Sequence, residues 1–196
     1  EKKGTQDWYH RGMQDILPTW RWWVEGTNGG TRTDLSFDLN WDDAYNVGTS
    51  IEVKGNLKAD AEYLTRLYKT KLAIEAGDKF ELVYKTEFAG SIEVKLATTE
   101  ANSTFATFPV VETSKKNGWS VASIDISSLA GKTVSIIALN FKSATALSNY
   151  KVQLGQLGIM AGNYAPAATP VANLMSQNAL KESISDIRLI WDAPAN

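Results

Sequence analysis

The sequence predicts an all-β chain that folds as an antiparallel two-sheet sandwich of about nine strands. Apolar and polar residues alternate with a period of two, for example over residues 35–39 and 92–96, as expected of strands with one buried face. Glycine-containing turns separate the strands, among them Asn-Gly at 117–118 and Ala-Gly at 130–131. No long amphipathic helix pattern intervenes, which disfavours a parallel sheet with crossover helices.

The expected strands follow in chain order from these alternations and turns. Residues 35–39, 51–57, 80–84 and 92–96 each place apolar side chains on one face and polar ones on the other. Longer apolar-rich runs predict the remaining strands, over residues 63–74, 105–111, 119–126, 133–141 and 150–160. The apolar residues expected to point into the core include Leu35, Phe37, Ile51, Val53, Leu82, Ile92, Val94, Ile124, Ile136 and Leu154.

Composition excludes several classes of partner and site. The 196 residues include 20 basic and 22 acidic ones, a formal net charge of −2, which gives no electrostatic basis for binding nucleic acid or anionic membranes. No apolar run approaches the ~20 residues that span a bilayer, so no membrane insertion is expected. The chain has no cysteine and a single histidine, His10, which excludes disulfides, thiolate metal sites and sites built from several histidines.

The opening segment, residues 8–23, is rich in aromatic side chains and reads Trp-Tyr-His-Arg-Gly-Met-Gln-Asp-Ile-Leu-Pro-Thr-Trp-Arg-Trp-Trp. It resembles the segment that leads into the β-sandwich module of glycoside hydrolase family 85, the endo-β-N-acetylglucosaminidases, which cut the chitobiose core of N-glycans. In that family the catalytic barrel precedes this segment. The resemblance implies that residues 1–30 dock to a barrel missing from this chain. The absence of a start methionine and of a signal segment agrees with a fragment of a longer protein.

Residues 31–162 resemble the galactose-binding-like jelly roll of many carbohydrate-binding modules. The resemblance rests on residues 118–132 and 150–159, and on a loop-to-strand passage at 42–51. It implies a jelly-roll β-sandwich, in which Gly155 marks a bulge or a close backbone approach.

The composition changes after residue 162. Residues 163–170 are a Pro/Ala linker. Residues 171–196 resemble the first strands of an incomplete fibronectin type III-like module, with Trp191 as its core anchor. A helix with Thr169 as N-cap and Pro170 in its first turn is the alternative.

No residue pattern predicts catalysis. A glycosidase needs two carboxyl groups facing each other across a cleft, and the family places its catalytic acid and the assisting amide on the barrel. The best carboxylates here, Asp38, Asp42 and Asp43, are more simply explained as turn residues. His10 is expected at a surface or an interface.

Aromatic residues with polar neighbours are the candidate site for carbohydrate binding or interdomain docking, because their rings offer a flat apolar area to sugar C–H faces. They comprise Trp20, Arg21, Trp22, Trp23, Trp41, Tyr45 and Trp119. Core or interdomain packing is the alternative for each ring. No cofactor is expected; a structural calcium ion is a lesser alternative, with oxygen ligands from Asp42, Asp43 and Asn46.

The sequence therefore predicts a non-catalytic accessory module of an endo-β-N-acetylglucosaminidase. Such a module braces the catalytic barrel of the same polypeptide and can also contact an N-glycan or another oligosaccharide. Two alternatives stay open: an autonomous carbohydrate-binding module, and a surface adhesion or assembly module without sugar affinity. The resemblance implies an extracellular or cell-surface location in a bacterium, although a cytoplasmic one stays open.

Overall fold

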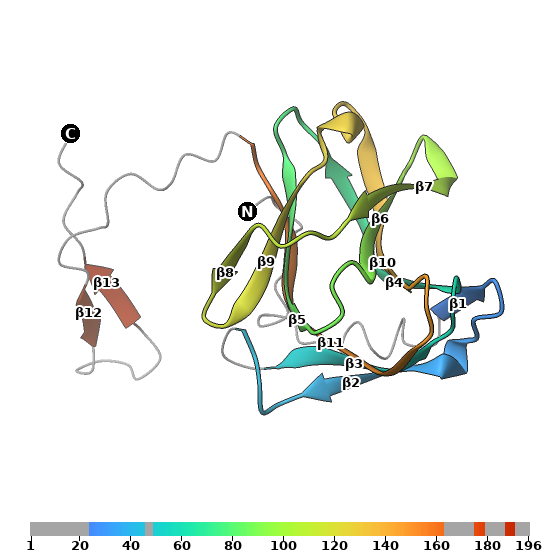
Figure 1. Ribbon diagram of the computed structural model, residues 1–196. Helices are drawn as coiled ribbons and strands as arrows, with labels where there is room; N and C mark the ends of the chain where they lie inside the picture. Colours follow the sequence, from blue (N-terminus) through green and yellow to red (C-terminus); the bar gives the residue numbers. More distant parts are fainter. Residues whose placement is uncertain (1–23, 46–48, 163–174, 179–186, 191–196) are drawn as a thin grey trace. The chain divides into compact units, whose positions relative to one another are not determined.

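A computed structural model describes residues 24–45, 49–162, 175–178 and 187–190. The chain divides into two compact units, Glu1–Asn163 and Tyr164–Asn196. In the larger unit two antiparallel β-sheets pack face to face, as Figure 1 shows. Within the described residues no helix is long and apolar enough to cross a membrane.

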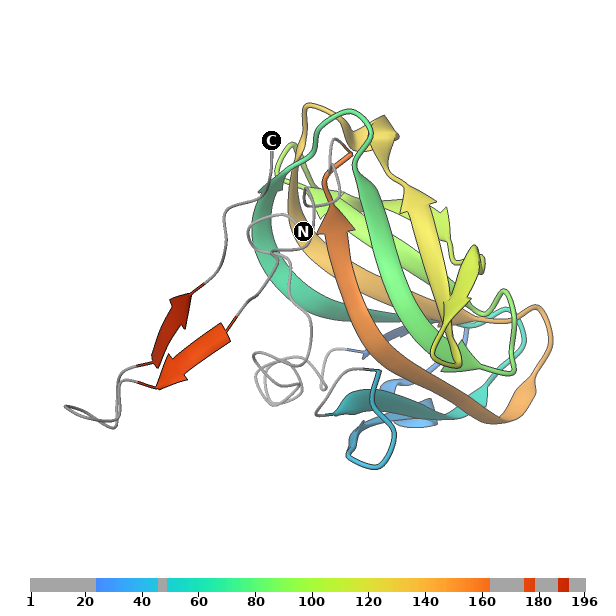
Figure 2. The same ribbon diagram turned by 90° about the vertical axis from the view of Figure 1, so that its left-hand side faces the viewer.

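The first sheet has five strands in the order β1-β4-β10-β6-β7. Its members, in that order, are β1 (Val24–Thr27), β4 (Glu62–Ala73), β10 (Thr133–Lys142), β6 (Ile92–Thr98) and β7 (Ala101–Pro109). The second sheet has six strands in the order β2-β3-β11-β5-β9-β8. They are β2 (Leu35–Asn40), β3 (Ser50–Leu57), β11 (Leu147–Met160), β5 (Lys79–Thr86), β9 (Trp119–Asp125) and β8 (Ser114–Lys116). Figure 2 shows β11 (orange), β5 (green) and β9 (yellow) curving side by side.

This architecture confirms the predicted antiparallel jelly-roll sandwich. Every expected strand is present, and two further ones, β1 and β8, extend the sheets at their edges. These edge strands have four and three residues, too few to show an alternation in the sequence. Short 3-10 helices at Arg32–Asp34 and Ser127–Leu129 complete the described part of this unit.

The core lies between the two sheets and follows the predicted alternation. All but one of the residues expected to point inward are buried there: Leu35, Phe37, Ile51, Val53, Leu82, Ile92, Val94, Ile124 and Leu154. The Phe141 ring makes edge-to-face contacts with Phe37 and Tyr150, at centroid distances of 6.0 Å and 6.2 Å.

Ile136 is the exception, and its predicted inward position is wrong. The side chain is only partly buried and lies outside the core, whereas its neighbour Ile137 is 3% exposed and belongs to the core. The pairing of β10 with both β4 and β6 shifts register between Val134 and Ile136. Such a bulge inserts one residue and moves the alternation to the next position.

The smaller unit contains an antiparallel pair, β12 (Met175–Asn178) and β13 (Ile187–Ile190). The first strands of a module were predicted within residues 171–196, and both strands of this pair lie in that range. One strand pair does not identify a fibronectin type III-like module, which stays a prediction. Thr169, Pro170 and Trp191 lie outside the described residues.

Candidate functional site

A second apolar cluster lies on the outer surface of the six-stranded sheet, separate from the main core. It consists of Val83 on β5 together with Trp119 and Val121 on β9, and Tyr45 from the loop after β2 packs against it. Val83 and Val121 are paired directly across the two strands. Because Leu82 and Tyr84 point into the core, Val83 between them points outward.

Trp119 is enclosed in this cluster. Its side chain is 2% exposed, and its ring meets the Tyr45 ring edge to face at 6.1 Å. The Lys85 Nζ lies 4.4 Å from the Trp119 ring centroid, a cation–π distance. The predicted platform residue Trp119 is thus covered by Tyr45 and Lys85, which leaves its ring no open face for a sugar.

Gly155 on β11 permits this packing. A Cβ at this position would lie 2.6 Å from the Tyr45 Cβ and 3.0 Å from a Trp119 ring carbon, closer than atoms pack. The pairing of β11 with β5 also shifts register between Leu154 and Gln156. The bulge and close approach expected at Gly155 are therefore both present.

Side-chain hydrogen bonds hold the described ends of the loop between β2 and β3. The Asn40 Oδ1 accepts from the backbone N–H groups of Asp42 and Asp43, at 2.9 Å and 3.2 Å. Ser50 Oγ donates to the Asp43 carbonyl at 2.6 Å. Asp42 and Asp43 thus lie in a turn, in agreement with the simpler interpretation, whereas Asp38 is an exposed residue of strand β2 and its assignment to a turn is wrong.

The carboxylate of Asp43 is already paired with a cation. Lys85 Nζ donates to both of its oxygens, at 2.9 Å and 2.8 Å. No group of three or more His, Cys, Asp or Glu side chains within the described residues could hold a metal ion. Asn46, the third residue of the predicted calcium alternative, lies outside those residues.

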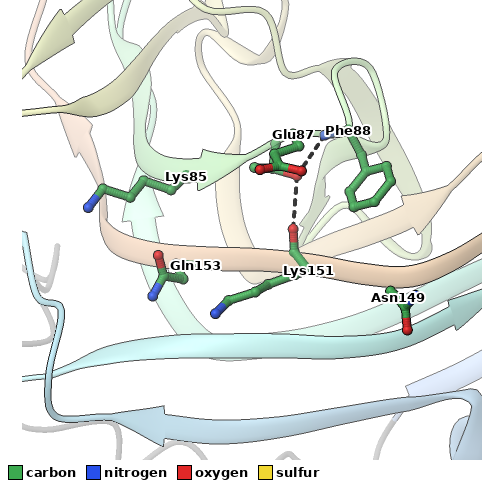
Figure 3. A pocket seen from close by; sticks show the side chains of 7 residues that line it. Lys85, Glu87, Phe88, Asn149, Lys151 and Gln153 are labelled. Atoms are coloured by element: carbon green, nitrogen blue, oxygen red, sulfur yellow. Dashed lines mark hydrogen bonds between the residues drawn. The ribbon is translucent and has the colours of Figure 1, made fainter.

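An open groove of about 430 Å³ lies beside the cluster, over the end of β5 and the neighbouring part of β11 with which it pairs. It is lined by Lys85, Thr86, Glu87, Phe88, Asn149, Lys151 and Gln153. Figure 3 shows the side chains of Lys151 and Gln153 on the same side of β11. Thr86 Oγ1 ties the two walls together, because it donates to the Lys151 carbonyl at 3.0 Å and accepts from the Phe88 N–H at 3.1 Å.

Charge pairs control the electrostatics beside this groove. Lys151 and Lys54 both bind the Glu52 carboxylate on β3. These hydrogen bonds, that of Lys151 first, lower the pKa of Glu52. Every described carboxyl group with a clear pKa shift has a lowered value, whereas a general acid needs a raised one.

Of the remaining predicted site residues, Trp41 is the one that the structure describes. Trp41 lies in the loop after β2 with 64% of its surface exposed. Trp20, Arg21, Trp22 and Trp23 lie outside the described residues. Sequence reasoning missed Lys85 and Gln153, which line the groove. The run Leu82-Val83-Tyr84 could have indicated this region of the sheet, because three apolar residues in succession break the alternation and place the apolar side chain of Val83 on the outer surface.

No protein-family model matches the sequence, and no curated protein matches it. Solved structures do. The glycoside hydrolase domain of Endo-D from Streptococcus pneumoniae R6 is 26% identical with a TM-score of 0.57, over 80% of this chain and 25% of that one. This chain thus spans about a quarter of the length of the Endo-D structure.

Two further structures share the fold alone. A structure of carbohydrate-binding modules from the β-sandwich superfamily is 8% identical with a TM-score of 0.54, over 81% of this chain and 62% of that one. A β-1,2-glucanase from Parabacteroides distasonis is 13% identical with a TM-score of 0.50, over 78% of this chain and 24% of that one. The fold is that of β-sandwich carbohydrate-binding modules, and the predicted resemblance to the β-sandwich module of family 85 glycoside hydrolases is confirmed.

Proposed function

We propose that this chain is a non-catalytic accessory module of an endo-β-N-acetylglucosaminidase that acts on the chitobiose core of N-glycans. The observation that carries the proposal is the 26% identity to the Endo-D glycoside hydrolase domain over 80% of this chain. The module braces the catalytic barrel of the same polypeptide. An extracellular or cell-surface location in a bacterium is part of this proposal.

The exposed ring of Trp41 supports a docking role. Within the described residues, Trp41 and Val111 are the two large apolar side chains that stand exposed, at 64% and 63%. Trp41 sits on a loop that Asn40 and Ser50 hold in place. A tryptophan exposed on the surface is typical of residues that become buried at an interface.

The test compares the whole polypeptide with a form that lacks residues 24–162. We expect the chain alone to release no glycan from a high-mannose glycoprotein. We expect the deletion to lower the melting temperature of the barrel, because the barrel loses a packed interface. Glycan release by the chain alone would overturn the proposal, as would a deletion that leaves both barrel stability and glycan release unchanged.

A matched pair of variants in the whole polypeptide tests the docking contact. Trp41→Ala should lower the melting temperature of the barrel, whereas Val111→Ala, which removes an equally exposed side chain, should leave it unchanged. Equal effects of the two variants would remove Trp41 from the interface.

The groove in Figure 3 favours a second candidate function, an autonomous carbohydrate-binding module. Amide and ammonium donors from Asn149, Gln153, Lys85 and Lys151 surround it beside the Phe88 ring, a mixture suited to sugar hydroxyls. A chitobiose-containing oligosaccharide in the groove should change Trp119 fluorescence saturably, because Lys85 contacts both. Gln153→Ala should weaken this binding, and absence of any binding would remove this candidate.

A further inference from the structure

The outer surface of the five-stranded sheet carries a second, smaller cleft of about 180 Å³. It is lined by Glu25, Thr27, Glu62, Leu64, Lys95, Phe105 and Asn140. Asn140 lies between the core residues Leu139 and Phe141 on β10, so its side chain points outward. The cleft shares no residue with the groove in Figure 3, and the described site residues predicted from the sequence, Trp41, Tyr45 and Trp119, do not line it.

Most of the charged side chains around this cleft form ion pairs. Arg66 binds Glu25 at 2.8 Å, and Lys142 and Lys95 bind Glu93 at 2.6 Å and 3.3 Å. Lys95 Nζ also donates to Thr107 Oγ1 at 2.9 Å. Immediately around the cleft, three acidic residues stand against three basic ones: Glu25, Glu62 and Glu93 against Arg66, Lys95 and Lys142. These neighbours of the cleft therefore give no net charge that would select an ionic ligand.

Asn140 is the polar group left incompletely bonded. Its side chain is fully buried, and its Nδ2 donates to Glu93 Oε2 at 3.0 Å. Its Oδ1 has no hydrogen-bond partner. Since buried polar groups in proteins are nearly always satisfied, an orphaned acceptor facing a cleft indicates a partner supplied from outside. The Nε of Arg66, on the neighbouring strand β4, is a buried donor without a partner.

Apolar side chains form the other part of the wall. Leu64 on β4 and the half-buried Phe105 on the edge strand β7 line the cleft, and the Arg66 guanidinium carbon lies 6.0 Å from the Phe105 ring centroid. This volume of about 180 Å³ is below the ~300–1,000 Å³ of a usual drug-sized site. The space therefore suits one small ring.

We propose that this cleft binds a single neutral, hydroxyl-rich ring, such as one sugar residue. An apolar face of the ring packs on Phe105 and Leu64, and one hydroxyl donates a hydrogen bond to Asn140 Oδ1. The inference deepens the carbohydrate-related role proposed above and rests on it, but it uses a different surface from the groove.

The test is a titration of the ¹⁵N-labelled chain with N-acetylglucosamine and with methyl α-mannoside, followed by amide NMR. We expect saturable shifts of the Asn140 side-chain amide and of the backbone amides around Phe105 with at least one of the two sugars. Phe105→Ala should weaken the binding about tenfold, because the ring contributes an apolar stacking surface. Asn140→Leu, a second variant on another strand, should abolish the saturable shifts around Phe105. The amide spectrum of this variant should keep the dispersion of a folded sandwich.

Val111→Ala is the matched control, since Val111 is an exposed apolar side chain that lines neither the cleft nor the groove, and the change should leave this binding unchanged. Two results would overturn the inference. Absence of saturable shifts with both sugars would assign the Asn140 acceptor to a bound water. Binding that survives Phe105→Ala and Asn140→Leu but is lost in Gln153→Ala would place the sugar in the groove. Either result is independent of glycan release by the whole polypeptide.

Discussion

The outer surfaces of the two sheets differ in how they use side chains that leave the core. On the six-stranded sheet, Val83, Trp119 and Val121 are covered by the Tyr45 loop, and Lys85 closes the cluster. On the five-stranded sheet, the outward side chains are mostly paired charges around a buried amide that lacks a partner. The first surface stabilises the fold by burying apolar area, whereas the second carries an uncompensated polar group.

This difference between the two outer surfaces distinguishes residues that stabilise the fold from residues that are candidates for binding. Burial of a large aromatic ring adds stability, so the Trp119 cluster needs no ligand to explain it. An unsatisfied buried acceptor lowers the stability of the fold by about 1–3 kcal/mol. The Asn140 Oδ1 is such an acceptor, so a contribution to stability does not explain its position. A side chain whose environment opposes folding is a better candidate for binding than an aromatic ring that packs well.

The largest expected effect tests which side of β10 is the inner one. Ile137→Asp should destabilise the fold by about 3–5 kcal/mol, because it buries an unpaired charge in the core. Ile136→Asp, one residue away but outside the core, should cost much less. Urea unfolding measures both changes, and equal losses would contradict the bulge between Val134 and Ile136.

This pair also marks the limit of what the sequence could predict about the fold. Strict alternation correctly identified the inward residues on strands such as β2, β3 and β6, because no bulge interrupts their pairing near those positions. On β10 the run Val134-Ser135-Ile136-Ile137 has apolar residues at both candidate positions, so local pattern cannot locate the extra residue. The partner strands β4 and β6 decide it.

The candidate sites were less predictable, for a different reason. Asn140 looks like any polar residue of an alternating strand, and its meaning depends on Glu93 and Leu64, which are distant in sequence. Lys85 likewise acquires a role only when Asp43 and Trp119 reach it from other elements. An aromatic residue can be identified from the sequence alone. An unsatisfied hydrogen-bonding group can be identified only when its neighbours in the folded chain are known.

The next largest effect tests the cluster on the six-stranded sheet. Trp119→Ala should cost about 3 kcal/mol, because it leaves a cavity where a buried ring contacted Tyr45 and Val83. Trp41→Ala in the same isolated chain should change stability by less than about 0.5 kcal/mol, since that ring is exposed. Thermal or urea unfolding followed by circular dichroism compares the two. Similar losses would mean that Trp119 contributes no more than a surface residue.

Asp34 gives a pH-dependent effect of intermediate size at the start of β2. It accepts hydrogen bonds from the Thr31 backbone N–H at 2.9 Å and the Tyr63 hydroxyl at 3.0 Å, and Lys58 lies 3.1 Å away. Burial raises the pKa of Asp34, but these hydrogen bonds outweigh it and lower the pKa to about 2.

Because this folded-state pKa is below the value of 3.8 for an unperturbed group, the carboxylate stabilises the fold above about pH 4 and loses that contribution as the pH falls toward 2. Asp34→Asn should therefore cost about 2 kcal/mol at neutral pH. Denaturant unfolding at several pH values should show the two proteins converging in acid. A stability gap that stays constant from pH 7 to pH 2 would contradict this role.

Among the test variants, controls aside, Asn140→Leu has the smallest expected effect on stability, and it tests the contrast between the two outer surfaces directly. Asn140→Leu should change the unfolding free energy by less than about 1 kcal/mol, since the lost hydrogen bond to Glu93 is offset by removal of an unsatisfied acceptor. Ser91→Ala is the matched control: Ser91 is also buried, but its Oγ bonds the Phe88 carbonyl at 2.7 Å and the Tyr150 hydroxyl at 2.9 Å. It should cost about 1–3 kcal/mol, because the buried Tyr150 hydroxyl loses its partner. If Asn140→Leu costs as much as Ser91→Ala, then the amide is fully satisfied in solution and the two outer surfaces differ less than their side chains indicate.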